Sequence, residues 1–177
     1  RVYYAAAQKI LAESMTRASD VLACLQEIYP RDESFKAMFA DKVIRTTDAR
    51  NNRVVRYILC ELERQHSEQD YEFDSDAFNI EHVLPQNPEQ GWEQFTDEEV
   101  DALVYRLGNM ALLARGANKD LGNASYAFKR PVLLASGFGL THKLADGNAD
   151  WTPERIAARQ KTLAKLAAVV WRIDQIS

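Results

Sequence analysis

The sequence predicts an α+β protein that is mainly α-helical and carries one small β-hairpin in its second half. Apolar residues recur at three- and four-residue spacing over most of the 177-residue chain, as expected for helices that bury one face. Two short apolar segments, residues 78–84 and 107–113, are instead bounded by proline or glycine, as strands are. Helical patterns lie on both sides of these segments, so we expect a hairpin embedded in helices.

Three helices are expected before the first strand. The first covers residues 2–28 and stops before a proline, and the second covers about 32–44. The third helix can be capped by Thr47 or Asp48 and ends near Gln65.

The first strand is expected at residues 78–84, because Pro85 would stop it. After a loop, Thr96 and Glu99 have the spacing of a capping box, which predicts a helix that runs to about Leu107.

The second strand, residues 107–113, is followed by a helix that begins at about Asn118 or Ser125. A Thr-Pro pair at positions 152 and 153 is typical of a helix start, and the last helix should extend to about Asp174.

The polar, acidic stretch 66–77 marks the one expected boundary. It divides the chain into a helical N-terminal part, residues 1–70, and a core with a C-terminal helix, residues 71–177, which we expect to form one compact unit cut from a longer protein. Cys24 and Cys60 lie in apolar helical patterns and are expected to be buried free thiols in a reducing cytoplasm.

Composition excludes several classes of protein. The chain is 46% apolar and 27% charged, and no apolar run is long enough to span a membrane. The sequence has neither a C-x-x-C pair for zinc nor a phosphate-binding loop for a nucleotide. A net charge of −4 argues against a protein that coats nucleic acid.

Charge is unevenly distributed along the second half. Seven acidic residues and no Lys or Arg lie between Glu81 and Asp101. Between Arg106 and Arg130 five basic residues face only Asp120, giving +4. This basic stretch could receive a phosphate backbone, although clustering by chance on a solvated face would look the same.

Four polar residues in and around the hairpin have the chemistry of a hydrolytic site. His82 can take a proton from water near neutral pH. Glu81 next to it and Asn118 offer the carboxylate and amide oxygens that suit a hard cation such as Mg²⁺, and Asn109 lies at the second strand. Each also has an ordinary alternative: a packed histidine, a solvated carboxylate, a helix cap or a turn residue.

Taken as a set, these motifs resemble an HNH-type endonuclease domain, which has the ββα-metal fold. More narrowly, they are similar to the C-terminal nuclease domain of GmrSD-type, modification-dependent restriction enzymes. The resemblance covers about residues 54–175. It rests on Asn79–Gln86, Leu107–Leu113, Asn118, Leu121–Asn123, Phe128-Lys129 and the late Trp151, Arg159 and Trp171.

The resemblance implies a role for each residue. His82 would be the general base, Glu81 and Asn118 would bind one divalent cation, and Asn109 would hold the loop that orients His82. Neighbouring strand residues point to opposite faces, so Glu81 and His82 can serve one site only if the strand ends or twists at His82.

The resemblance also implies the substrate and partners. The substrate would be DNA, cut one strand at a time for an anti-phage restriction system. The cation would be Mg²⁺, with Mn²⁺ as the alternative. A nucleotide-binding sensor domain would precede this chain and choose the target. Phosphates could be contacted by four cations, Arg115, Lys119, Lys129 and Arg130.

Two alternatives to this function remain at the level of sequence. One is a non-catalytic module for DNA or protein on the same scaffold, and the other is a nuclease for RNA or single strands. Sequence does not specify the modification, the oligomeric state or whether both strands are cut.

Overall fold

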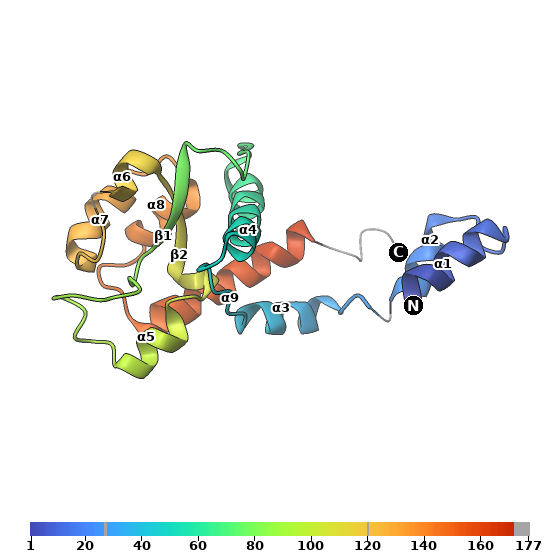
Figure 1. Cartoon of the computed structure of the whole chain (residues 1–177), viewed down its shortest axis with the longest axis horizontal. Coiled ribbons are helices and arrows are strands. Elements are labelled where there is room, and N and C mark those ends of the chain that lie inside the picture. Colours follow the sequence, from blue (N-terminus) through green and yellow to red (C-terminus); the bar gives the residue numbers. More distant parts are fainter. Residues whose placement is uncertain (27, 120, 172–177) are drawn as a thin grey trace.

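The computed structural model describes residues 1–26, 28–119 and 121–171, and it is a mainly helical α+β fold (Figure 1). The helices surround one antiparallel sheet of two strands, which confirms the predicted fold class. Within the described ranges, no helix combines the length and the apolar character needed to cross a membrane.

The first two helices lie at one end of the molecule, away from the others (Figure 1). α1 (Val2–Leu11) and α2 (Ala18–Leu25) pack mainly on each other, so the prediction of one helix over 2–28 is wrong. The chain turns because Glu13 adopts a left-handed backbone with a φ of 54°, and the amide and hydroxyl of Ser14 both donate to the Lys9 carbonyl.

Helix α3 (Asp32–Ala40) ends earlier than predicted because the chain after it pairs with a distant segment. Val43 forms an isolated antiparallel bridge with Arg106, and the Ile44 amide donates to the Tyr105 carbonyl at 3.0 Å. This pairing places the connection between α3 and α4 next to the residues that precede the second strand.

Helix α4 (Ala49–Ser67) begins where the sequence predicts. Asp48 caps it by accepting a hydrogen bond of 2.8 Å from the Asn51 amide. Cys60 is buried on this helix, whereas Cys24 is only half-buried because α2 packs on little besides α1. Both thiols are free.

The predicted hairpin is present. β1 (Phe78–His82) and β2 (Met110–Ala114) are antiparallel, with Phe78 opposite Ala114 and His82 opposite Met110. The first three residues of the predicted second strand instead form a 3-10 turn, η1 (Leu107–Asn109), because this segment packs against the last helix.

The turn η1 is held by hydrogen bonds from two side chains of α9 (Pro153–Val170). Gln160 accepts from the Gly108 amide at 2.6 Å, and Arg159 donates to three carbonyls of residues 107, 108 and 110. Thr152 caps α9 as predicted, while the expected end at Asp174 falls outside the described residues.

The remaining helices lie around the hairpin. The predicted capping box of Thr96 and Glu99 opens α5 (Asp97–Leu103), which is shorter than expected. After β2 come α6 (Arg115–Lys119), α7 (Tyr126–Leu134) and α8 (Gly139–Asp146), in place of the single helix expected there.

The hairpin separates two apolar clusters because its side chains alternate between faces. Phe78, Met110 and Leu112 join α4 and α9 on one face. Ala111 and Leu113 join residues of α7 and α8 on the other. Side chains at consecutive positions of β1 therefore face different surroundings.

Candidate active site at the end of the hairpin

His82 is the last residue of β1, and its side chain faces the connection between α3 and α4. Its Nε2 lies 3.1 Å from Thr46 Oγ1, and the ring meets Tyr105 edge-on with centroids 5.8 Å apart. Burial, with the positive charge of Lys129 adding to it, lowers the pKa of His82 to about 4. The imidazole is therefore neutral near pH 7, the state in which it can accept a proton.

Glu81 faces the opposite side of the hairpin, as strand alternation requires. The residue is 5% exposed, and its carboxylate accepts a 2.6 Å hydrogen bond from Lys129 Nζ. Burial raises the pKa of Glu81, and the charge of Lys129 opposes that rise. Glu81 is thus one half of a buried ion pair.

Lys129 is the other half of this pair, and it differs most from the sequence-based prediction. Its side chain is fully buried, and its ammonium also donates to the His82 carbonyl at 2.9 Å. A buried ammonium cannot meet a phosphate at the surface, so the expectation that Lys129 contacts DNA is wrong for this arrangement. Lys129 instead connects α7 to the residues on which the candidate site is built.

Asn109 fixes the chain that follows β1. It is fully buried, its Oδ1 accepts from the Leu84 amide at 2.8 Å, and its Nδ2 donates to the Leu84 carbonyl at 2.8 Å. The same oxygen accepts from Trp151 Nε1 at 3.0 Å, and the amide nitrogen also donates to Val104. One side chain therefore connects the segment after His82 to the end of α5 and to the segment that precedes α9.

Asn118 lies on α6 beside β1, where its Nδ2 donates to the Ile80 carbonyl at 3.2 Å. It lines a polar hollow of about 400 Å³ together with Asn52, Asn79, Ile80, Arg115 and Lys119. This hollow lies at the edge of β1, since both Asn79 and Ile80, which alternate to opposite faces of the strand, line it.

The donor set fits a hard cation in type. Glu81 and Asn118 supply carboxylate and amide oxygens, which is the chemistry that Mg²⁺ prefers. Across the described parts of the chain, no group of three or more His, Cys, Asp or Glu side chains could hold a metal ion. A cation here would need water or substrate oxygens to complete its shell, and it would share Glu81 with Lys129.

The other predicted DNA contacts differ in their accessibility. Arg115 and Lys119 are exposed on α6, and Arg115 lies 3.8 Å from exposed Asp76. Arg130 is half-buried, and its Nε donates to the carbonyls of Ala145 and Asn148. Arg115 and Lys119 are therefore the accessible members of the predicted set.

Sequence reasoning missed the residues that surround His82. Thr46 and Tyr105 come from segments outside the strand and helix that carry the motifs, and neither stands in a recognisable pattern. The pairing of residues 43–44 with 105–106 brings them together. Only this long-range contact could have identified them.

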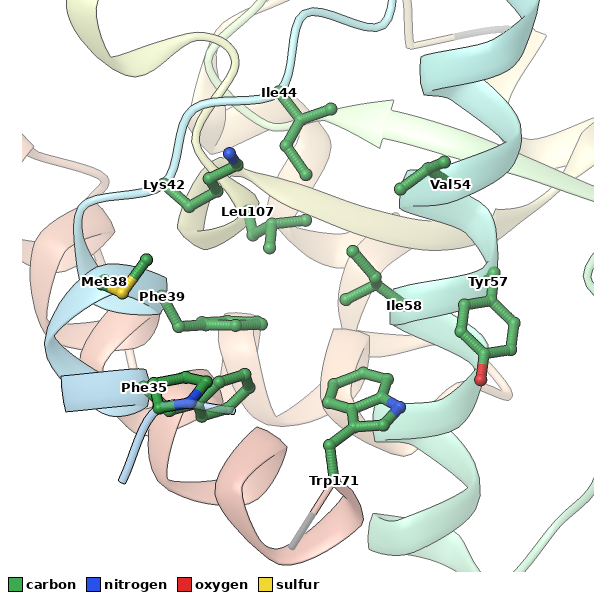
Figure 2. A pocket seen from close by; sticks show the side chains of 11 residues that line it. Phe35, Met38, Phe39, Lys42, Ile44, Val54, Tyr57, Ile58, Leu107 and Trp171 are labelled. Carbon is green, nitrogen blue, oxygen red and sulfur yellow. The ribbon is translucent and has the colours of Figure 1, made fainter. Parts of the chain in front are cut away.

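A separate apolar cavity of about 480 Å³ lies between α3, α4 and the end of α9 (Figure 2). Phe35, Phe39, Ile58 and Trp171 point into it, and Lys42 is the one charged residue among the described residues that line it. In the part of the chain that the structure describes, its lining offers neither a carboxylate nor an imidazole, so we do not assign it to the candidate site.

Comparison with known proteins identifies one family. Residues 29–166 match the profile of the family described as GmrSD restriction endonucleases, C-terminal domain. The matched region includes the whole hairpin, α6, α7 and the connection that contains Thr46. No curated protein matches the chain.

Proposed function

The chain belongs to the family of C-terminal domains of GmrSD restriction endonucleases, and from this premise we propose that it is an HNH-type, metal-dependent DNA endonuclease. The observation that carries the proposal is the setting of His82. His82 is the last residue of β1, and its imidazole is neutral near pH 7. One ring nitrogen forms a hydrogen bond with Thr46, and the side chain of Asn109 forms hydrogen bonds with the segment that follows.

His82 would act as the general base. With its proton on Nε2 and donated to Thr46 Oγ1, the lone pair of Nδ1 is free to take a proton from water. That water would then attack the phosphorus of a phosphodiester in line with the leaving 3′ oxygen, giving 5′-phosphate and 3′-hydroxyl ends. Thr46 would hold the ring in the orientation that this step needs.

Glu81 and Asn118 would hold one divalent cation, Mg²⁺ or Mn²⁺. When bound, the cation supplies charge stabilisation at the phosphate and at the leaving oxygen. Lys129 donates a hydrogen bond to Glu81 and would keep it in place. A substrate bound beyond the end of β1 at His82 would be reached from both faces of the strand. Arg115 and Lys119 would contact phosphates.

Partners outside this chain follow from the same proposal. A preceding domain would sense the modification and bind the nucleotide, within an anti-phage restriction system in the cytoplasm. The chain by itself should bind DNA weakly and with little sequence preference, because its net charge is −4.

The test is nicking of supercoiled plasmid with Mg²⁺ or Mn²⁺. His82→Ala should lower the rate by about 10²–10⁴-fold, the usual contribution of a general base. Asn118→Ala should raise the metal concentration needed, and excess EDTA should stop the reaction. Lys161→Ala on the exposed face of α9 is the matched control and should cut normally.

Three outcomes would contradict the proposal. Cleavage that survives His82→Ala or EDTA would exclude the assigned chemistry. DNA binding without any cleavage would favour a non-catalytic module, and cleavage of RNA or single strands alone would change the substrate.

A further inference from the structure

The connection between α3 and α4 contributes an exposed cation near His82. Arg45 is exposed, and its guanidinium lies 5.4 Å from the centroid of Tyr105, the ring that meets His82 edge-on. The next residue, Thr46, holds His82 itself. An arginine from the first half of the chain therefore stands one side chain away from the candidate base.

Two hollows join this connection to α6. One, of about 400 Å³, is lined by Thr46, Asn52 and Arg53 among others. The other is the polar hollow of Asn118, Arg115 and Lys119, and Asn52 lines it too. Because Asn52 lines both hollows, they are neighbours: the first includes Thr46, the partner of His82, and the second includes the exposed cations of α6.

We propose that residues 45–53 and 115–119 form the two walls of a binding site for the sugar–phosphate backbone of DNA, with Arg45 and Arg53 as phosphate contacts. This inference rests on the proposed nuclease function. It adds a wall from the N-terminal part of the chain to a site whose accessible basic residues named so far, Arg115 and Lys119, both follow the hairpin. Amide side chains at Asn52, Asn79 and Asn118 can donate to phosphate oxygens between the walls.

The acidic residues near Arg53 and Arg115 do not prevent these arginines from binding phosphates. Arg53 lies 3.6 Å from Asp74 and Arg115 lies 3.8 Å from Asp76, and all four side chains are more than half exposed. Exposed pairs of this kind contribute about 0–1 kcal/mol, so a phosphate can replace the carboxylate. Asp48, between Arg45 and Arg53, is occupied as the cap of α4.

The experiment measures binding to a short DNA duplex across a salt series, by fluorescence anisotropy. All proteins carry His82→Ala and the buffer contains EDTA, so cleavage does not interfere. Each phosphate contact contributes about 0.9 to the slope of log K against log salt. Arg45→Gln with Arg53→Gln should therefore reduce the slope by about two.

Two matched variants distinguish the loss of local phosphate contacts from the effect of a change in the net charge of the protein. Lys161→Gln with Lys165→Gln removes two exposed charges from α9 and should leave the slope unchanged. Arg45→Lys with Arg53→Lys keeps the charges and should retain the wild-type slope. Thermal unfolding of each variant verifies that the fold is kept.

The inference is overturned if the glutamine pair and the α9 pair change the slope equally, or if the parent protein shows no salt-dependent binding. Either result leaves plasmid nicking by the protein with intact His82 as an independent measure of the proposed function. Conversely, if the glutamine pair reduces the slope but the protein with intact His82 does not nick plasmid, the backbone-binding site is supported and the nuclease function is rejected.

Discussion

Replacing Lys129 by Met should destabilise the fold strongly, and the effect should depend on pH. The side chains of Lys129 and Glu81 are 0% and 6% exposed, and their charged atoms are 2.6 Å apart. Removing the ammonium leaves a carboxylate buried without its cation, a change that typically costs about 3–5 kcal/mol. The His82 carbonyl also loses a 2.9 Å hydrogen bond.

Protonation of Glu81 limits this loss. Keeping a carboxyl of ordinary pKa protonated costs about 3.7 kcal/mol at pH 7 but only about 1 kcal/mol at pH 5. The destabilisation of Lys129→Met should therefore be near 4 kcal/mol at pH 7 and should shrink by about 2–3 kcal/mol at pH 5. In the variant, the pKa of Glu81 in the folded protein is raised above its value in the unfolded chain. The folded protein therefore gains stability as the pH falls.

Urea unfolding of the wild type and Lys129→Met at pH 5 and pH 7 measures this effect. Lys165→Met, at an exposed position of α9, is the control and should stay within about 0.5 kcal/mol of the wild type. Glu81→Leu combined with Lys129→Met should recover most of the lost stability, since an apolar pair needs no counter-charge. A loss below about 1 kcal/mol at pH 7, or an equal loss at both pH values, would refute the reasoning.

Three further predictions concern residues around the pair. Thr46→Val should change the free energy of unfolding by no more than about 1 kcal/mol. It should slow plasmid nicking about 10- to 100-fold, as for other residues that orient a functional histidine. Unchanged nicking would show that Thr46 is not part of the site. Asn109→Ala should cost at least about 3 kcal/mol in urea unfolding, because buried backbone groups at Leu84 and Val104 and the Trp151 indole lose their partner; a mild effect would mean that water replaces the amide. The depressed pKa of His82 should give stability that is complete above about pH 6.5 and declines as pH falls toward 4, by up to about 3 kcal/mol; a His82→Gln variant with the same decline would assign it to another group.

The local parts of this protein could be predicted from sequence. Asp48, Thr96 and Thr152 cap helices because each offers a side-chain oxygen to an amide two or three residues ahead. The hairpin followed from two short apolar segments with stop signals, and the motif residues could be listed from their types and spacing. These features depend on neighbouring residues along the chain.

The tertiary structure decided which of those residues are accessible and what surrounds them. Lys129 and Lys119 are both lysines in one basic stretch, but packing of α7 against the hairpin buries the first with Glu81 while the second stays at the surface. Thr46 reached His82 only because residues 43–44 pair with 105–106, some 60 positions away. Residue type and spacing determined which chemical groups the chain contains. Burial and long-range backbone pairing determined which of these groups lie together, because both depend on the packing of the whole chain.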